Sequence, residues 1–552
     1  MGLSERGLNM KKSTNKAIIY SILVFLMILF FHSYNNLLLI TKPPSDEWGR
    51  DIHIDISPYK KSVSIEMDED IAEILTAKED RFTKTAINRK EGRIINEEDI
   101  IIEDASLNKL VKYQGCGQHI FWTENYNLFI SSRGQGGSYS KKNKILENVV
   151  DFTVLSKDDG ILLIAAFAQG LRVYKIDETG ANICGHDYYF ENPLKVSVSL
   201  DNRGALHIAS INKNSVMDRE IVYLRFIDEN WSLVGRKVES ITSTTERIGN
   251  LEIGLDKNYA YIFYETDLWN SFRQSANTWY TAFELNNLND IEMDFKMFMP
   301  DKEEYQGNVF VSELKCDDYQ MEELKALYIK NDFDDASDGF RIYSVSFSEG
   351  EMLNKNEVSK LTPWVKGISL DSYNGEYAVT FLQAAGEFKN EVWYTESGEL
   401  YKESVKKGKT GDYIRAVEDA IPPYISGLVI ALIRGLLLSP AVFWLIGVEF
   451  FEAKKFLKNP KLNYSVAMSI YMIIKLISAG FYYNGLSYYL IPDILSFPGM
   501  KYLMMIVISA IAYYITKEYK KNKPDMYVIA EFLLFMLCDL LITVFFYGPY
   551  IT

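Results

Sequence analysis

Long apolar stretches occupy both ends of this 552-residue chain, whereas its middle alternates between short apolar and polar segments. Residues 17–40 form the first stretch, and a helix rising about 1.5 Å per residue would carry it across the ~30 Å hydrocarbon core of a bilayer. Four more apolar runs follow near the C-terminus, at residues 424–450, 464–483, 502–516 and 526–547. The pattern predicts five transmembrane helices, although the short run 502–516 also fits a buried core helix.

The basic residues between these runs predict the orientation of the chain in the membrane. Residues 451–463 and 517–525 each carry four lysines, whereas residues 484–500 carry no lysine or arginine. Basic connections stay in the cytoplasm. We therefore expect the N-terminus inside, residues 42–423 outside, and the C-terminus outside.

The first apolar run also begins like a secretory signal peptide. Basic side chains precede it within residues 1–16, but no small-residue cleavage site follows it. This predicts an uncleaved signal anchor at residues 17–40. The abundance of Ile, Lys, Asn and Tyr is typical of a low-GC bacterium, so we expect a multi-pass protein of a bacterial cell membrane.

The region between the predicted spans reads as a series of short strands. From about residue 110, β-branched and aromatic runs alternate with Asp, Asn and Gly turns, as in an all-β fold. The runs recur with a spacing of about 43–58 residues, a range that suits the four-stranded blade of a β-propeller. The sequence predicts a propeller of about six blades over residues 106–415. The charged residues 41–105 are interpreted as an acidic stalk or flanking strands.

Aspartates recur at equivalent places in these units. We expect them to hold tight turns by accepting backbone N–H groups; they are Asp158, Asp201, Asp256 and Asp371. Two of the turns read Ser-x-Asp followed by Gly, at residues 156–160 and 199–204. This feature resembles, loosely, the bacterial propeller repeats of the sialidase-like or Asp-box kind. The Thr-Trp that completes an Asp-box is missing, so the resemblance implies architecture only, over about 300 residues.

Charge is divided unevenly along the chain. Residues 1–44 carry five basic and one acidic side chain, and residues 421–552 carry eleven and seven, so each flank has a net charge of +4. The whole chain has −15, which leaves −23 on residues 45–420. Such an acidic domain repels polyanions, so nucleic acid is excluded as a partner. The remaining interpretations are a solvated acidic surface and a site for cations or basic partners.

No catalytic or cofactor motif emerges from the sequence, and we predict no cofactor and no metal. Gly408-Lys409-Thr410 lacks the earlier glycine of a P-loop, since position 403 is Glu. The acidic stretch 331–339 departs from the EF-hand pattern, which leaves an irregular calcium site or a solvated turn. Arg172, Arg225 and Arg341 occupy similar late strands, as a sialidase-like arginine triad or as solvated side chains. Three cysteines would face the outside, where their disulfide state is open; they are Cys116, Cys184 and Cys316.

Three ionisable residues fall inside the predicted spans, where charge is costly and often functional. Counted from the cytoplasmic edges, Arg434, Lys475 and Asp539 all lie about 18–21 Å deep, close to the bilayer midplane. We predict that Asp539 pairs with Arg434, with Lys475 as the next nearest base. The alternative is that the helices are turned apart and Lys475 extends to the interface.

The sequence favours a non-enzymatic binding, sensing or assembly protein. Its propeller would bind a ligand or protein outside the cell, and its helices would couple to a membrane-protein partner. The cytoplasmic segments are too short to hold a kinase, an ATPase or a DNA-binding module. The alternatives are a cell-surface glycan or peptide hydrolase and an accessory subunit of a transporter.

Overall fold

The computed structural model divides the chain into two compact units, and each is described by itself. One unit comprises Met1–Lys42, Asp334–Ser337 and Gly408–Thr552, and the other Pro43–Phe333 and Asp338–Lys407. The residues that the structure describes are 2–57, 63–134, 136–157, 160–176, 183–190, 192–215, 218–240, 246–270, 273–286, 291, 293–300, 311–334, 337–360, 362, 364–384, 389–422, 438–450, 459–478, 495, 497 and 499–547.

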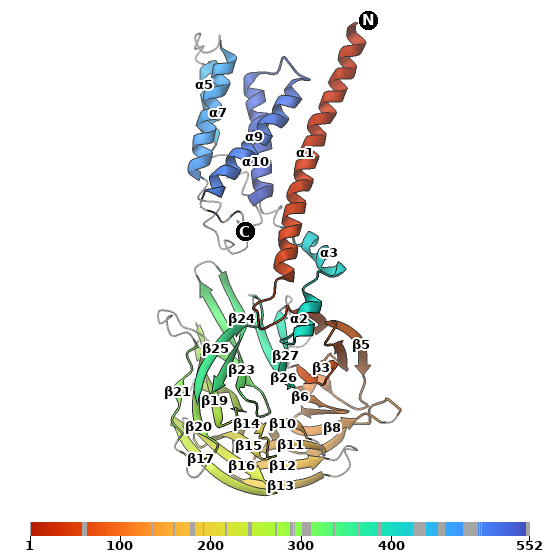
Figure 1. Cartoon of the computed structure of the whole chain (residues 1–552), viewed down its shortest axis with the longest axis vertical. Coiled ribbons are helices and arrows are strands. Elements are labelled where there is room, and N and C mark those ends of the chain that lie inside the picture. The colour runs from red at the N-terminus through yellow and green to blue at the C-terminus, as the bar shows by residue number, and fades with distance from the viewer. Residues whose placement is uncertain are drawn as a thin grey trace. The chain divides into compact units, whose positions relative to one another are not determined.

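The larger unit is a β-propeller of seven four-stranded sheets (Figure 1). Six blades are each built from four consecutive strands. Blades 1 to 3 are β2 (Ser64–Met67), β3 (Ile71–Ala77), β4 (Phe82–Asn88) and β5 (Arg93–Ile100); β6 (Leu110–Cys116), β7 (His119–Glu124), β8 (Asn127–Ser132) and β9 (Asn143–Leu146); and β10 (Val149–Lys157), β11 (Gly160–Phe167), β12 (Gly170–Ile176) and β13 (Ile183–Tyr189). Blades 4 to 6 are β14 (Pro193–Leu200), β15 (Leu206–Lys213), β16 (Asp218–Ile227) and β17 (Asn230–Ser240); β18 (Glu246–Leu255), β19 (Tyr259–Asn270), β20 (Arg273–Glu284) and β21 (Lys296–Met297); and β22 (Val311–Cys316), β23 (Leu324–Asp334), β24 (Ser337–Ser348) and β25 (Glu351–Glu357).

The seventh blade joins the two ends of the propeller chain. Its inner three strands are β26 (Val365–Tyr373), β27 (Glu376–Ala384) and β28 (Asn390–Glu396), and its outer strand is β1 (Ile52–Ser57). Strand β1 pairs antiparallel with β28, with Ile52 opposite Tyr394. The inner strands of neighbouring blades contact one another all the way round, including β26 with β2, so the ring is closed.

The propeller architecture predicted from the repeats is confirmed, but the number of blades is wrong. The missing blade is β2 to β5, which lies within residues 41–105, the region interpreted as an acidic stalk or flanking strands. Its outer strand β5 reads RIINEEDI and is mostly exposed, so charged side chains dilute its strand pattern. Strand β1 in the same region completes blade 7 rather than connecting an anchor to the propeller.

The hydrophobic core lies between successive blades. The second strand of blade 3, β11, is buried over seven of its eight residues because a blade covers each of its faces. One cluster joins Ile164 of β11 to Leu206 and Ile208 of β15, on the next blade. A single blade cannot bury both of its faces alone. The apolar side chains of each strand are therefore buried only when the blade lies between its neighbours in the ring.

The segments that enter and leave the propeller are fastened to each other. The N–H of Gly49 donates to the carbonyl of Glu396 at 2.9 Å, and Thr395 Oγ1 donates to the carbonyl of Gly49 at 2.8 Å. A side chain at position 49 would collide with the ring of Tyr401, which lies on helix α2 (Glu399–Val405). This contact holds β1 against β28 and so secures the last blade.

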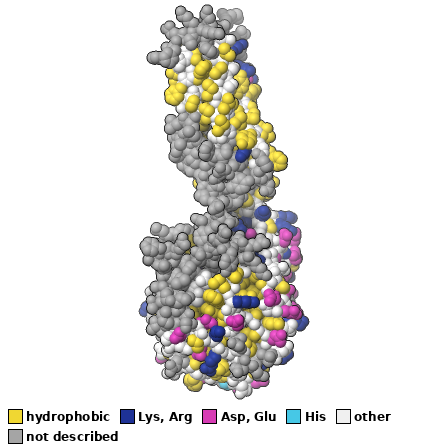
Figure 2. All heavy atoms as spheres, turned by 90° about the vertical axis from the view of Figure 1, so that its left-hand side faces the viewer, with side chains coloured by type: hydrophobic (Ala, Val, Ile, Leu, Met, Phe, Trp, Pro, Cys, Tyr) yellow, Lys and Arg dark blue, Asp and Glu magenta, His cyan; other side chains and the backbone are white. Residues whose placement is uncertain are grey.

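The smaller unit is helical. Its described helices are α1 (Gly2–Thr41), α3 (Thr410–Glu418), α5 (Ser439–Phe450), α7 (Pro460–Ile477), α9 (Met500–Lys520) and α10 (Val528–Tyr547). Three stretches are long and apolar enough to span a membrane: Lys16–Thr41, Met500–Lys520 and Val528–Tyr547. Figure 2 shows hydrophobic side chains gathered on the visible surface of this unit.

The comparison with the predicted spans is therefore partial. Three of the five predicted helices are confirmed as candidate membrane spans, and the run 502–516 belongs to a helix of 21 residues. Of the run 424–450, residues 424–437 lie outside the described residues, and α5 covers residues 439–450. The five crossings and their orientation stay predictions.

The closure of the ring predicts which part of the chain folds on its own. Residues 43–407, expressed without the membrane helices, should give a β-dominated circular dichroism spectrum and one cooperative unfolding transition. A shorter piece, residues 106–407, lacks blade 1 and β1 and should aggregate or unfold without cooperativity. Equal cooperativity in the two pieces would contradict a closed seven-bladed ring.

Candidate functional site

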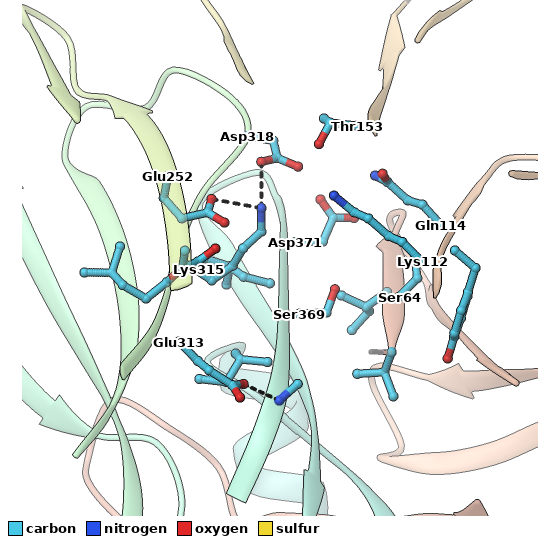
Figure 3. Close-up of a pocket in the computed structure, with 18 of the residues that line it drawn as sticks. Ser64, Lys112, Gln114, Thr153, Glu252, Glu313, Lys315, Asp318, Ser369 and Asp371 are labelled. Atoms are coloured by element: carbon cyan, nitrogen blue, oxygen red, sulfur yellow. Dashed lines mark hydrogen bonds and ion pairs between the residues drawn. The ribbon is translucent and has the colours of Figure 1, made fainter. Parts of the chain in front are cut away.

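A central cavity runs along the axis of the propeller and is its candidate functional site (Figure 3). Its volume is about 1040 Å³, and residues from all seven inner strands line it. The cavity therefore belongs to the closed ring and not to any single blade.

The inner strands share an irregularity near their first residues. In six of them, all except β2, the pairing register shifts, as it does at a β-bulge. A bulge bends a strand and turns its side chains in a new direction. Polar residues at or beside these shifts line the cavity: Lys112, Asp151, Lys195, Asn250, Glu313 and Lys366.

A ring of side-chain hydrogen bonds links each inner strand to the next. In six of the seven steps an inner-strand side chain accepts from the backbone N–H of its neighbour. The six bonds are Met67 to Asp371 Oδ2 at 2.6 Å, Gly115 to Ser64 Oγ at 3.1 Å, Val154 to Gln114 Oε1 at 3.0 Å, Val196 to Asp151 Oδ2 at 3.1 Å, Ile253 to Ser197 Oγ at 3.1 Å, and Gly367 to Glu313 Oε2. In the seventh step Asn250 Nδ2 donates to the carbonyl of Leu314 at 2.6 Å.

Lysines and acids alternate around the cavity. Lys112 Nζ lies 2.8 Å from Asp151 Oδ1. Lys315 Nζ lies 3.2 Å from Glu252 Oε2 and 3.1 Å from Asp318 Oδ1 (Figure 3). Burial by itself would raise the pKa of Asp151, but its lysine neighbours outweigh burial and hold that pKa below its ordinary value.

Burial has the larger effect on two other acids of the cavity. It raises the pKa of Glu252 although Lys315 lies beside it. It also raises the pKa of Asp371 well above the ordinary value, and the neighbouring carboxyl of Asp317 adds to the shift.

The four aspartates predicted to hold turns have different positions. Asp201 Oδ1 accepts from the N–H groups of Arg203 and Ala205, and Asp256 Oδ1 accepts from those of Asn258 and Tyr259, as expected for turns. Asp158 lies outside the described residues.

Asp371 does not hold a turn, contrary to the prediction. It lies within β26, and the turn that follows that strand is Asn374-Gly375, both with positive φ. The Asp371 carboxylate instead faces the cavity and binds the first strand of blade 1.

One loop crosses an end of the channel. Residues 317–323, between β22 and β23 of blade 6, reach over to blades 3, 4 and 5. Tyr319 Oη donates to the carbonyl of Ser156 at 3.0 Å, the Gln320 N–H donates to the carbonyl of Leu200 at 2.9 Å, and Gln320 Nε2 donates to the carbonyl of Asp256 at 2.9 Å. Since blade 3 lies across the axis from blade 6, this loop covers the end of the channel at which the inner strands finish.

The remaining candidates from the sequence do not converge on a site. The three arginines lie on different blades: Arg172 binds Asp187, Arg225 lies 3.7 Å from Asp201 Oδ2, and Arg341 lies 2.9 Å from Glu357 Oε1. The side chains of residues 331–338, in the acidic stretch, are outside the described part of the structure.

Two of the three cysteines predicted to face the outside are buried free thiols. They are Cys116, which lines the cavity, and Cys316. Burial raises the pKa of both thiols, so neither is poised as a thiolate. The side chain of Cys184 lies outside the described residues.

In the helical unit, the charges predicted at mid-membrane depth form a buried network. Lys475 Nζ lies 2.7 Å from Asp539 Oδ2, with 2% and 0% of the two side chains exposed. Ser509 Oγ and Tyr471 Oη also donate to the Asp539 carboxylate. The alternative in which Lys475 extends to the interface is wrong, and the partner seen for Asp539 is Lys475. Arg434 lies outside the described residues, so its predicted pairing stays untested.

Comparisons with known proteins assign no family. No protein-family model and no curated protein matches the chain. Similar solved structures include the polysaccharide lyase Uly1, at 10% identity and a TM-score of 0.41, covering 62% of this chain and 90% of that one. The β-propeller domain of the trilobed protease from Pyrococcus furiosus is 9% identical, with a TM-score of 0.35 and coverage of 62% and 98%. Virginiamycin B lyase from Staphylococcus aureus is 11% identical, with a TM-score of 0.34 and coverage of 63% and 98%. The propeller assignment stands on the seven sheets of this chain, and these similarities assign no activity.

The buried carboxyl of Asp317, at the start of the crossing loop, predicts a pH dependence of stability. Burial raises its pKa to about 6. The unfolded chain titrates near the ordinary value of about 3.9, so the native state loses stability as the pH rises between those two values. The change Asp317→Asn should therefore stabilise the protein by roughly 2–3 kcal/mol above pH 7, with no gain below about pH 4.

Denaturant unfolding of both proteins across this pH range measures the difference. The control is Glu322→Gln on the same loop, where the carboxylate is largely exposed and should show no such pH-dependent gain. If Asp317→Asn and the parent had the same free energy of unfolding at pH 7.5, burial would not disfavour the charged form of Asp317.

The Lys475–Asp539 network predicts an asymmetry between single and double substitutions. Asp539→Asn leaves the lysine charged and buried, which typically costs about 3–5 kcal/mol. We expect this variant to accumulate poorly in the membrane, and Lys475→Met combined with Asp539→Leu to accumulate better. Cys538→Ala, at the position before Asp539 in α10, is the control and should accumulate normally. Equal loss in the single and double variants would show that the pair is not the stabilising feature.

Proposed function

We propose that this protein is a non-enzymatic binding protein of a bacterial cell membrane. Its propeller lies outside the cell and binds a ligand in the central cavity. Its apolar helices anchor the propeller and pass the bound state to a membrane-protein partner.

The observation that carries this proposal is the paired state of the charges in a large cavity. Asp151, Glu252 and Asp318 contact lysines, and Glu313 and Asp371 accept backbone N–H groups. Acids with such engagements hold the ring together and are poorly placed to exchange protons with a substrate. A cavity of this kind suits binding better than general acid–base chemistry.

The ligand we propose is a neutral, hydroxyl-rich molecule, such as the end of a sugar chain. Three of the seven acids that line the cavity pair with lysines, and the other four accept backbone N–H groups, so each of these carboxylates is engaged within the protein. A sugar hydroxyl can donate to a carboxylate and accept from a lysine at the same site. Neutral hydroxyl and amide side chains also line the cavity: Ser64, Gln114, Thr153, Ser156 and Ser369.

The membrane part of the proposal rests on the three long apolar helices and on the distribution of lysines. A basic N-terminus and two lysine-rich connections support a propeller on the outer side. The short cytoplasmic segments offer no effector domain, so a partner in the membrane would carry the signal onward.

An oligosaccharide array tests the proposed binding. The full-length protein in mild detergent should bind at least one neutral glycan. Filling the cavity with Thr153→Trp should weaken that binding at least tenfold, about 1.4 kcal/mol. Ser232→Trp, at an exposed position of β17, is the matched control and should bind normally.

Two results would contradict the proposal. If the protein bound only charged glycans, the proposal of a neutral ligand would be wrong. If the recovered glycans were shortened, or were products of an elimination reaction, a hydrolase or another enzyme would be favoured. Because a tryptophan can disturb packing, Ser369→Leu serves as a second cavity variant, and the thermal midpoint of each variant is compared with that of the parent.

A further inference from the structure

The short helix α3 carries an apolar face that is exposed in the part of the chain that the structure describes. Tyr413, Ile414, Val417 and Ile421 belong to α3 and the turn that follows it, and each side chain is between 42% and 56% exposed. At about 100° per residue these four side chains fall within one arc of roughly 100°. Exposed apolar side chains scattered singly are ordinary, but four on one helical face form a contact surface.

The other sides of α3 are accounted for. Ala416 and Ala420 are buried beside that arc, and α3 packs against α1. Asn36 Nδ2 of α1 donates to the carbonyl of Ala416 at 3.2 Å. The charged side chains occupy the opposite arc: Asp412, Arg415, Glu418 and Asp419.

The contact with α1 fixes where the apolar face lies. Asn36 is close to the end of the candidate membrane span Lys16–Thr41, and Tyr34 and Leu38 near that end are themselves exposed apolar side chains. Tyr34 and Leu38 lie about 200° from Asn36 around α1, on the side away from α3, so the contact places α3 beside the end of this candidate span rather than on the face that carries those two side chains. In the sequence, the apolar run that begins at Tyr424 follows α3 almost at once.

We propose that α3 is an interfacial helix that lies in the headgroup region of the bilayer, with Tyr413, Ile414, Val417 and Ile421 against the acyl boundary. An amphipathic helix with low overall hydrophobicity binds a membrane surface in this way. The helix would fix the depth of the outer end of α1 and of the chain that enters the next apolar run. Lys407 and Lys409, exposed just before α3, suit the phosphate groups of anionic lipids.

Site-directed spin labelling of the full-length protein tests this position. The background carries Cys184→Ser and Cys538→Ala and keeps the buried Cys116 and Cys316. One label is introduced by Val417→Cys and the matched one by Asp419→Cys, on the opposite arc of the same helix. The protein is placed in nanodiscs of phosphatidylcholine and phosphatidylglycerol, and collisions with oxygen and with a water-soluble nickel chelate are measured.

A lipid-facing label meets oxygen readily and the nickel chelate rarely. We expect the ratio of oxygen to nickel accessibility to be several-fold higher at position 417 than at position 419. Equal ratios, with both labels open to nickel, would overturn the proposal because α3 would then lie in water. A label at 417 shielded from both reagents would also overturn it, since a protein surface or a second copy of the chain would cover the face. Ile414→Cys provides an independent repeat if one label disturbs the helix.

Discussion

The structure depends on how the inner strand of each blade satisfies its free edge. An inner strand pairs with its second strand along one side, and its other side carries backbone N–H groups that a sheet leaves unpaired. In this propeller those groups meet side chains of the neighbouring inner strand, from Ser64 through Asp151 and Glu313 to Asp371. The seven contacts of the ring, six at backbone N–H groups and one at a carbonyl, close only when all seven blades are present. Strand β1 precedes blade 1 in the sequence and forms the outer strand of blade 7, so it holds the last blade to the first part of the chain.

The same contacts determine the chemistry of the cavity. Carboxylates that hold backbone N–H groups are fixed in place, and Asp151 also has the lysine Lys112 beside it. The cavity is thus rigid, polar and locally dipolar. This is why the proposed function is recognition of a neutral polar ligand. The crossing loop at residues 317–323 spans one end of the channel.

The sequence predicted what local patterns encode and missed what distant pairing decides. Strand repeats and apolar spans can be predicted from the sequence because the alternation of apolar and polar residues and the length of an apolar run are local properties. Strand β1 pairs with β28 more than 300 residues away, and nothing near residue 52 reveals that partner. Asp371 was misread because Ser369-Leu370-Asp371 repeats the tripeptide at 199–201, although the Asn374-Gly375 pair that follows is itself a strong hairpin signal.

The candidate sites divide in the same way. Counting residues from the membrane edges predicts that Lys475 and Asp539 lie at the same depth, and the structure brings them together. A count of residues does not give the rotation of each helix about its own axis. The lysines and acids of the cavity form no motif in the sequence. They lie at or beside register shifts in separate inner strands, which only the folded ring brings together. Only the fold shows that the loop at residues 317–323 crosses the channel.

Hydrogen exchange at single-residue resolution tests the closed ring most directly. The amides of Met67, Gly115, Val154, Val196, Ile253 and Gly367 lie on strand edges, where an amide open to water exchanges rapidly. If side chains of the neighbouring blade hold them, they should exchange as slowly as amides paired within the blades, and Asp151→Ala should accelerate Val196 before the others. Rapid exchange of these six amides in the intact protein would contradict the account, because the inner strands would then be independent edges around an open channel.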